Sequence, residues 1–135
     1  MEKINMQLNS QFDQITKIEK LIEDVCSEYK INQDCYGNML VALTEAVNNA
    51  IQHGNKFDTS KKINILFEPQ NQLLKFEITD EGDGFDFNQV PDPTAPENLE
   101  KPNGRGVFLM RHLADDVKYF DNGRKVELTF KACVN

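Results

Sequence analysis

The first half of the chain shows two spacings of apolar residues, one typical of a strand and one typical of helices. Apolar and polar residues alternate over residues 2–8, which predicts a strand. Between residues 11 and 29, apolar residues return at every third or fourth position, which predicts an amphipathic helix with Ser10 as its cap. The same spacing over residues 35–53 predicts a second helix, which follows a short polar connection.

The second half of the chain contains two further pairs of alternating segments. The first pair lies over residues 63–78 and predicts a hairpin with a turn at residues 68–72. The second pair lies over residues 117–130 and predicts a hairpin with an Asn-Gly turn at residues 121–123. Between the hairpins, the apolar positions of residues 107–114 predict a third helix.

The order of these elements predicts the fold class. It runs strand, helix, helix, strand, strand, long loop, helix, strand, strand, so hairpins dominate it. We expect an α+β fold, a two-layer sandwich in which three helices cover one face of a mixed, mostly antiparallel sheet. The length of 135 residues is that of one ordinary domain, so we expect a single domain over residues 1–135. Residues 81–106 form the long loop, and a loop of this length inside a compact domain is often functional.

Charge, hydropathy and cysteine content narrow the possible environments of the protein. Fifteen basic and 22 acidic residues give a net charge of −7, which argues against a general nucleic-acid binder and against binding to an anionic membrane surface. No apolar run reaches the roughly 18 residues that span a bilayer, and the first residues do not resemble a secretory signal. We therefore expect a cytoplasmic protein. The three widely spaced cysteines favour reduced thiols over a disulfide framework or a zinc site: Cys26, Cys35 and Cys133.

A polar stripe on the second predicted helix is the first candidate site. Glu45, Asn49 and Gln52 project from one side of this helix, opposite its apolar face. A solvated helix face is the ordinary interpretation of such a stripe. The adjacent Asn48 and Asn49 weaken that interpretation, because asparagine is a poor helix former. An asparagine oxygen can ligate Mg²⁺, and a glutamate one turn away can orient or deprotonate a nucleophile.

An acidic, glycine-containing turn follows the strand that ends near residue 79. Its sequence is Asp80-Glu81-Gly82-Asp83-Gly84. Glycines let a ligand approach the backbone closely, and a carboxylate at a strand end can accept a hydrogen bond from an exocyclic amine such as that of adenine. The alternative is an acidic turn or a calcium loop, but the ligand spacing and closing glutamate of an EF-hand are absent. The pattern alone is a weak signal.

A second glycine-containing segment leads directly into the third predicted helix. Its sequence is Asn103-Gly104-Arg105-Gly106. Free backbone amides and the helix dipole favour an anion at such a position, and Arg105 can add a charge-assisted contact to a terminal phosphate. The alternative is an ordinary flexible loop at a helix start. The segment lacks the Gly-Lys-Ser/Thr of a Walker loop.

Together, the order and spacing of these three segments resemble the N, G1 and G2 boxes of the GHKL ATPases, the superfamily of gyrase, Hsp90, histidine kinases and MutL. The length of the chain and the residues of the boxes are most similar to those of the anti-sigma-factor serine/threonine kinases of the SpoIIAB and RsbW group. Proteins of that group also carry Glu-Ala-Val-x-Asn-Ala-x-x-His-Gly, which here runs from Glu45 to Gly54. The resemblance spans nearly the whole chain.

The resemblance implies the Bergerat ATP-binding fold, with ATP or ADP and Mg²⁺ held between the helix layer and residues 81–106, which would be the ATP lid. It implies that Asn49 ligates the Mg²⁺. It also implies that Glu45 acts as the base or as the orienting group for the attacking hydroxyl. Such a site catalyses phosphoryl transfer mainly by positioning and charge neutralisation.

The resemblance also implies roles for residues of the other two boxes. Asp80 would accept a hydrogen bond from the adenine amine, and Gly82 and Gly84 would let the backbone pass close to the base and ribose. Arg105 would lie near the γ-phosphate in a catalytic role. Two neighbouring glycines would present their amides to the phosphates: Gly104 and Gly106.

Three other polar side chains lie close to the boxes in the sequence. His53 is expected to cap or pack the end of the second helix rather than to act in chemistry. His112 is expected to be structural or exposed. Arg111 is left open between a position facing the lid and one facing solvent.

One position departs from the pattern of the resembling proteins. Many of them have a threonine in the last strand, just after a glycine turn and near the adenine. Here Gly123 is followed by Arg124, and Thr129 is out of register. A threonine contact to adenine from this strand is therefore in doubt.

The resemblance implies an ATP- and Mg²⁺-dependent protein kinase that phosphorylates a serine of a STAS-domain antagonist, an anti-anti-sigma factor, and that sequesters a sigma factor. A homodimer is possible, because members of the group are often dimers, and neither nucleic acid nor membrane is an expected partner. The alternative is a non-enzymatic, ATP-dependent switch that binds a partner through the same fold. A fragment of a gyrase-like machine and a histidine-kinase catalytic domain rank lower, because this sequence carries neither a transducer domain nor a His box.

Overall fold

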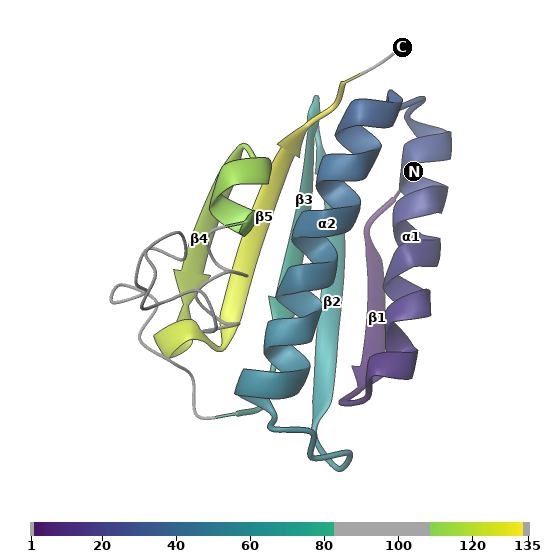
Figure 1. Cartoon of the computed structure of the whole chain (residues 1–135). Helices are drawn as coiled ribbons and strands as arrows, with labels where there is room; N and C mark the ends of the chain where they lie inside the picture. Colours follow the sequence, from purple (N-terminus) through teal and green to yellow (C-terminus); the bar gives the residue numbers. More distant parts are fainter. Residues whose placement is uncertain (1, 83–108, 134–135) are drawn as a thin grey trace, which may run out of the picture.

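The computed structural model describes residues 2–82 and 109–133 and arranges them as a sheet with a helix layer (Figure 1). The predicted order of elements is confirmed within these residues. The third predicted helix is present as a helical segment over residues 109–113, and its expected beginning lies outside the described residues. The elements are β1 (Ile4–Asn9), η1 (Phe12–Gln14), α1 (Ile15–Glu28), α2 (Gln33–Asn49), η2 (Ala50–Gly54), β2 (Lys62–Gln70), β3 (Leu73–Thr79), β4 (Asp116–Phe120), η5 (Asp121–Gly123) and β5 (Lys125–Lys131).

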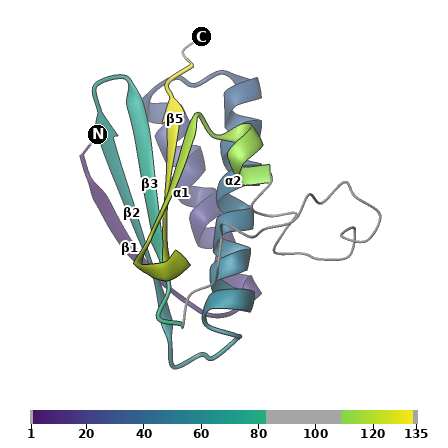
Figure 2. The ribbon, with the colours of Figure 1, turned by 90° about the vertical axis from the view of Figure 1, so that its left-hand side faces the viewer.

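The sheet has five strands in the order β1-β2-β3-β5-β4, and each neighbouring pair is antiparallel. It confirms the expected α+β sandwich, with no parallel pair among the described strands. The register places Ile65 of β2 opposite both Met6 of β1 and Ile78 of β3. Helices α1 and α2 and the segment 109–113 lie on the same side of the sheet (Figure 2).

The core lies between the sheet and the helix layer. The central strands alternate buried and less buried side chains, so that Ile63, Ile65 and Phe67 of β2 all face the helices. Phe67 and Phe76 pack with ring centroids 5.0 Å apart. Burial of each such side chain contributes roughly 1.5–3 kcal/mol. The apolar spacing seen in the sequence therefore corresponds to one continuous core.

The helix ends differ from the expectation at Ser10. This residue does not cap α1, which has no side-chain cap at its first turn. Instead the hydroxyl of Ser10 donates to the carbonyl of Lys61 at 2.7 Å and accepts from Asn55 at 2.9 Å. Ser10 is fully buried, because it joins β1 to the segment before β2 rather than facing solvent at a helix start. Helix α2, by contrast, is capped by Asn32, whose side chain accepts from the backbone of Cys35.

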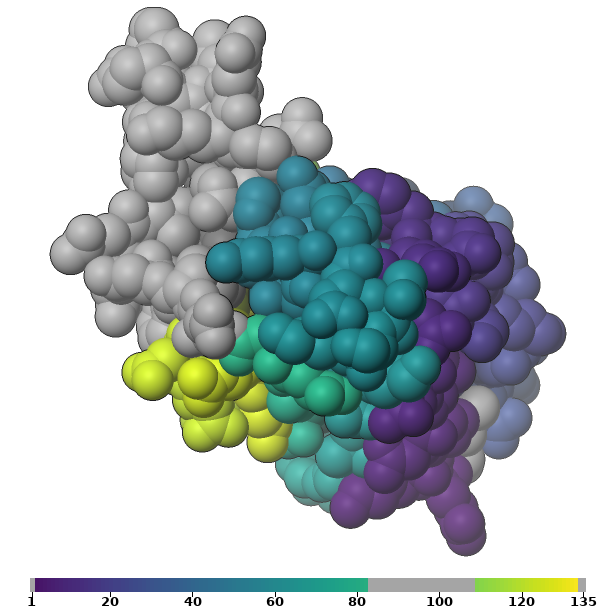
Figure 3. Space-filling model, turned by 90° about the horizontal axis from the view of Figure 1, so that it is seen from below, coloured from purple at the N-terminus to yellow at the C-terminus, as the bar shows by residue number. Residues whose placement is uncertain are grey.

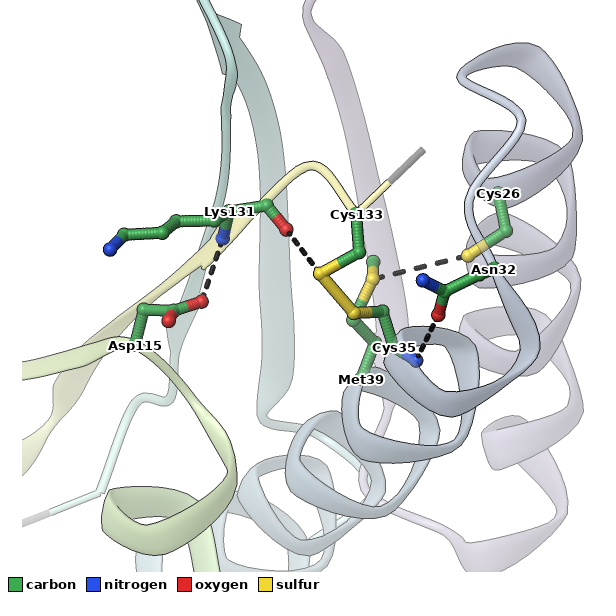
Figure 4. The surroundings of a disulfide bond; sticks show 7 residues. All are labelled: Cys26, Asn32, Cys35, Met39, Asp115, Lys131 and Cys133. Atoms are coloured by element: carbon green, nitrogen blue, oxygen red, sulfur yellow. Dashed lines mark hydrogen bonds between the residues drawn. A yellow bond between two sulfur atoms is a disulfide. The ribbon is translucent and has the colours of Figure 1, made fainter. Parts of the chain in front are cut away.

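The cysteines correct the expectation of three reduced thiols. Cys35, in the first turn of α2, forms a disulfide with Cys133, which follows β5, and their Cα atoms are 6.1 Å apart (Figure 4). The two residues are 98 positions apart in the sequence. Their distance in sequence hid their proximity in space, because the last strand of the sheet ends beside the start of α2. Cys26 is the free cysteine, and it is buried.

The last hairpin connects β4 to β5 through residues 121–124, a longer connection than a two-residue Asn-Gly turn. The backbone φ angles of Asp121, Asn122 and Gly123 are all positive, at 53°, 57° and 87°. Asparagine, aspartate and glycine tolerate this region best. In the part of the chain that the structure describes, no helix has the length and apolar character needed to cross a membrane.

Candidate functional site

A pocket opens where four segments that are distant in the sequence meet at one end of the sandwich. These are the end of α2, the end of β3, the helical segment 109–113 and the β4–β5 connection. Figure 3 looks onto this end, where the chain around the end of α2, in teal, lies near the connection in yellow. The pocket is lined by Ala46, Asn49, Ala50, Gly54, Ile78, Asp80, Met110, Tyr119, Gly123, Arg124 and Val126. The structure thus brings together two of the predicted site residues, Asn49 and Asp80.

Asp80 is held rigidly at the end of β3. Its backbone N–H donates to the carbonyl of Arg124 at 2.9 Å, which extends the pairing of β3 with β5 by one residue. Its Oδ1 accepts from the backbone N–H of Gly82 at 2.8 Å. Only 8% of the residue is exposed, and this burial raises the pKa of the carboxyl, although the Gly82 N–H and the positive charge of Arg124 oppose the rise. The fixed carboxylate lines the pocket as an acceptor.

Two glycines pack so closely around Asp80 that neither position has room for a side chain. A Cβ atom on Gly54 would lie 2.3 Å from Oδ2 of Asp80. A Cβ atom on Gly82 would lie 1.8 Å from the carbonyl oxygen of Gly54. Both distances are far shorter than any van der Waals contact. The end of α2 and the turn after β3 therefore meet backbone to backbone beside the pocket.

Gly54 had not been selected as a site residue from the sequence. The signal available was its place at the end of the Glu45-to-Gly54 motif. The observed contact of Gly82 is with the backbone of Gly54, and its expected closeness to a base and ribose stays a prediction.

Asn49 brings an unsatisfied amide to the pocket. It lies in the last turn of α2, and its Nδ2 is buried without a hydrogen-bond partner among residues 2–82 and 109–133. Rotation of the Asn49 amide group by half a circle exchanges its oxygen and its nitrogen, so the side chain can present either an acceptor or a donor to a ligand. A buried polar atom left unpaired costs about 1–3 kcal/mol, so a bound group that satisfied it would be stabilised. The amide therefore fits the predicted role of a Mg²⁺ ligand.

The chemistry of the surroundings limits how a cation would be held there. Within the described ranges, no group of three or more His, Cys, Asp and Glu side chains is placed to hold a metal ion. A Mg²⁺ ion at Asn49 would thus depend on the oxygens of a bound ligand and on water for its other positions. Mg²⁺ commonly binds in this way in nucleotide sites.

Asn55 secures the end of α2 and was missed by the sequence reasoning. Helix α2 ends in the π-helical turn Ala50–Gly54, which closes with a bond from the Asn55 N–H to the carbonyl of Ala50. The Asn55 side chain donates to Ser10 and to the carbonyl of Lys62, and it accepts from the backbone N–H of Glu81. It is 1% exposed and fully engaged. Asn55 thus ties the π-helical turn to β1, to β2 and to the segment that carries Asp80.

Glu45 faces a different space from Asn49 and Asp80. It lies one turn before Asn49 on α2, but it lines a groove of about 330 Å³ beside α1 rather than the pocket. The other residues of this groove are Glu19, Leu40, Val41 and Thr44. Among the residues that the structure describes, Glu45 is thus not part of the lining that Asn49 and Asp80 share. In one helix, Glu45 and Asn49 face two neighbouring spaces.

The remaining predicted residues of the boxes lie outside the described residues. This applies to the larger part of the expected lid, residues 81–106, of which the structure describes only Glu81 and Gly82. It also applies to Gly84, Gly104, Arg105 and Gly106. Their roles stay predictions.

The last strand confirms the departure noted in the sequence. Thr129 pairs with Lys75 and Asp116, and its side chain lies on the opposite face of β5 from the core residue Leu128. It therefore does not reach the pocket. Gly123 and Arg124 line the pocket from this side instead, and the Nε of Arg124 donates to the carbonyl of Gly82 at 2.6 Å.

Neither histidine is among the residues that line the pocket, and nor is Arg111. His53 packs in the π-helical turn, where burial lowers its pKa and leaves its Nε2 without a partner among the described residues. His112 is exposed, as expected. The guanidinium of Arg111 lies 6.0 Å from the ring centroid of Tyr119, a residue of the pocket wall.

Comparison with protein families identifies the class of protein to which this fold and pocket belong. Residues 8–130 match the family model described as the histidine kinase-like ATPase domain. The chain belongs to the histidine kinase-like ATPase family. The match covers every element that contributes to the pocket.

Within this family the chain is similar to proteins called serine-protein kinase RsbW. Relatives of this name from Bacillus cereus (strain ATCC 10987 / NRS 248), Bacillus anthracis and Bacillus thuringiensis (strain Al Hakam) are each 30% identical over 135 residues. Each match covers 95% of this chain and 84% of the relative. The similarity therefore extends over nearly the whole of both proteins.

A solved structure shows the same fold. It contains the RsbU and RsbW domains of a protein from Mycobacterium tuberculosis, and it superposes with a TM-score of 0.67 at 12% identity. The superposition covers 98% of this chain and 32% of the longer chain. At this identity the likeness bears on the fold alone.

Proposed function

We propose that the protein binds ATP with Mg²⁺ in the pocket and transfers the γ-phosphate to a serine of a partner protein. The observation that carries the proposal is one pocket that holds a fixed, buried carboxylate, Asp80, and an unsatisfied amide, Asn49. Similarity to relatives called serine-protein kinases over nearly the whole chain supports the reaction type. The STAS-domain antagonist and the sigma factor are the partners that the family resemblance suggests.

The pocket residues divide between the base and the phosphates of ATP. Asp80 accepts a hydrogen bond from the adenine amine, because the N–H of Gly82 already holds its Oδ1 and the carboxylate loses little further entropy. Asn49 holds the Mg²⁺ through its amide oxygen. When bound, the ion neutralises charge on the phosphates. Arg105 and the glycines Gly104 and Gly106 act on the terminal phosphate, and residues 81–106 cover the nucleotide as a lid.

Glu45 suggests where the acceptor enters. Because Glu45 lines the groove beside α1 while Asn49 lines the pocket, nucleotide and acceptor reach the same face of α2 from two neighbouring spaces. The acceptor hydroxyl approaches through the groove, and the carboxylate of Glu45 orients it or takes its proton. Val41, a groove residue that is 42% exposed, offers the acceptor an apolar contact.

The first test is Mg²⁺-dependent ATP binding measured by calorimetry. We expect wild type to bind ATP. Asn49→Ala and Asp80→Asn should each bind it at least about tenfold more weakly, because the first loses the contact to Mg²⁺ and the second loses the charge-assisted hydrogen bond to adenine. Asn48→Ala is the matched control, because Asn48 is the neighbouring asparagine but does not line the pocket. Absence of binding in wild type, or equal losses for Asn48→Ala and Asn49→Ala, would overturn the proposal.

One observation favours a second candidate, a non-enzymatic switch that binds a partner when ATP is bound. Glu45, the proposed base, does not line the same pocket as Asn49 and Asp80. Glu45→Gln separates the two functions. Loss of phosphate transfer to a serine acceptor with intact ATP binding supports the kinase, whereas unchanged partner binding and signalling without any transfer in wild type supports the switch.

The proposal also covers the localisation, the domain organisation and the assembly of the protein. We place it in the cytoplasm as a single domain over residues 1–135, and the family resemblance suggests a homodimer as its assembly. Nucleic acid and membrane are not among its proposed partners.

A further inference from the structure

The disulfide joins the two layers of the sandwich at the end opposite the pocket. Cys35 belongs to the first turn of α2, and Cys133 follows the last strand of the sheet (Figure 4). A backbone hydrogen bond runs beside it, from the N–H of Asn32 to the carbonyl of Cys133 at 2.8 Å. The disulfide thus joins two segments that this backbone hydrogen bond already holds side by side.

The two elements that the bond connects are also two walls of the pocket. Helix α2 carries Asn49 at its other end, and β5 and the residue before it carry Val126 and Arg124. A link between the start of α2 and the end of β5 therefore restrains how the helix lies on the sheet along its whole length. Opening or closing this bond therefore acts on the pocket through these two rigid elements.

The disulfide is accessible to small reagents. Both cysteines are only partly buried, and they line a cavity of about 170 Å³ with Leu113, Asp115 and Phe130 among its other walls. This cavity is large enough to admit a small thiol. Cys133 Sγ also lies 3.5 Å from the carbonyl oxygen of Lys131, which can accept a hydrogen bond from the thiol once the bond is reduced.

The third cysteine is excluded from exchange with this pair. Cys26 is buried on α1, with its sulfur 3.9 Å from that of Met39. Burial raises the pKa of its thiol to about 11. It therefore stays protonated near neutral pH, and only a thiolate attacks a disulfide. The pair Cys35 and Cys133 can open and close without rearranging to a second pairing.

We infer that Cys35 and Cys133 form a reversible redox clasp that holds α2 against β5 and thereby strengthens nucleotide binding when it is oxidised. A disulfide in a cytoplasmic protein is usually a transient, redox-sensing one, because thiol systems reduce it. The link to nucleotide binding rests on the proposed function, while the clasp itself rests on the geometry. The clasp makes the proposed kinase responsive to the thiol balance around it.

The chemistry of opening is ordinary thiol–disulfide exchange. A thiolate of a dithiol attacks one sulfur and forms a mixed disulfide, and the second cysteine sulfur leaves and takes up a proton. The second thiol of the reagent then attacks the mixed disulfide and releases the other cysteine as a thiol. In total, two electrons and two protons pass to the protein, and the dithiol becomes a cyclic disulfide. A small disulfide such as oxidised glutathione reverses the exchange: it reforms the bond between Cys35 and Cys133 and is released as two thiols.

The test compares the full chain after incubation with dithiothreitol and after incubation with oxidised glutathione. Thiols are counted by alkylation under denaturing conditions and mass spectrometry, Tm is measured, and the Kd for ATP with Mg²⁺ is measured by calorimetry. We expect one alkylated cysteine, Cys26, in the oxidised protein and three in the reduced protein. On reduction, Tm should fall by roughly 10 °C and the Kd for ATP should rise about fivefold.

Two variants and one control sharpen this test. Cys35→Ser and Cys133→Ser should behave like the reduced protein under both treatments, and Cys26→Ala should keep the full response. Three alkylated cysteines in the oxidised protein, or an unchanged Tm and Kd on reduction, would overturn the clasp. Absence of ATP binding in both states would overturn the proposed function instead, and the change in Tm would then decide the clasp on its own.

Discussion

The two ends of the sandwich differ in how far their polar side-chain atoms are paired. At the disulfide end, the polar groups around Cys35 are paired: Asn32 accepts from the Cys35 backbone, and Asp115 accepts from the backbone of Lys131 at 2.7 Å. At the pocket end, three side-chain atoms at the end of α2 and in the π-helical turn are buried without partners in the described residues: Asn48 Oδ1, Asn49 Nδ2 and His53 Nε2. Of these, Asn49 Nδ2 belongs to a residue that lines the pocket.

This difference separates stability from binding. Buried polar groups are nearly always paired, so unpaired ones gathered at one end of a helix indicate a place where another group belongs. The disulfide end contributes its free energy to the folded chain without any ligand. At the pocket end, buried polar atoms lack hydrogen bonds in the free protein, and a bound ligand can supply such bonds. Substitutions at the two ends that leave the disulfide closed should therefore differ in what they change.

The largest effect is expected from a side chain placed in the backbone contact of the pocket end. Gly82→Ala puts a Cβ where only 1.8 Å separates it from the carbonyl oxygen of Gly54, so the turn must move away from α2. We expect ATP binding to be lost, with Kd at least about a hundredfold higher, and the free energy of unfolding to fall by about 3 kcal/mol. Calorimetry and urea unfolding measure the two effects.

Gly37→Ala is the control for this substitution. Gly37 lies in α2 near the disulfide end, and a Cβ there would meet nothing within 4 Å. Because alanine favours the helix over glycine, the free energy of unfolding should rise by roughly 0.5–1 kcal/mol with no change in Kd. If Gly82→Ala bound ATP like wild type, the described contact between the two glycines would not form part of the site.

A smaller effect, on stability alone, is expected at the disulfide end. Asn32→Ala removes the side chain that accepts from the Cys35 N–H at the start of α2. The free energy of unfolding should fall by about 1 kcal/mol, the usual cost of losing a helix cap, and the Kd for ATP should stay within about twofold of wild type. Asn32→Asp, which keeps an acceptor, should restore stability. A tenfold loss of ATP affinity in Asn32→Ala would contradict the division between the two ends.

The smallest effect has the opposite sign and concerns Asp80. Burial raises the pKa of Asp80 in the folded state above 3.8, the ordinary value that it has in the unfolded chain. Between these two pKa values the folded protein binds the proton more tightly than the unfolded chain does. The stability of wild type therefore falls as pH rises through the folded pKa. Asp80→Asn carries no such charge, so it should be the more stable protein at neutral pH, while binding ATP poorly.

Thermal unfolding without nucleotide between pH 3.5 and 7 measures this difference. The two proteins should have nearly equal Tm values at the acid end of the range, and the advantage of Asp80→Asn should grow as pH rises. A wild type that gained stability relative to Asp80→Asn over this range would show that burial does not dominate at Asp80. The cause would then lie with the opposing contacts of Gly82 and Arg124.

The elements of the fold were predictable because burial follows the periodicity of each segment. The spacing over residues 11–29 and 35–53 placed both helices within a few residues of their observed bounds, and the alternation over residues 63–78 placed the central hairpin. Ser10 shows the limit of such reasoning. A serine before a helix has the character of a cap, yet here the partners of Ser10 come from Lys61 and Asn55.

The candidate site was predictable in part. Asn49 and Asp80 stood in recognisable motifs, and the structure brings them to one pocket. Gly54 and Asn55 were missed as site residues, because their importance comes from contacts with Asp80 and Glu81, which belong to another part of the chain. The separation of Glu45 from the pocket was likewise hidden, since one turn of helix was expected to face one space.

The sequence by itself determined which residues are apolar on each segment, hence the helices, the strands and their order, and it determined the motifs that carry Asn49 and Asp80. The tertiary structure decided the strand order β1-β2-β3-β5-β4, the glycine contact behind Asp80, the groove at Glu45 and the bond from Cys35 to Cys133. The physical reason is the range of the information. Periodicity records which side of one segment avoids water, whereas these features depend on which distant segments come within bonding distance once every segment has buried its apolar side.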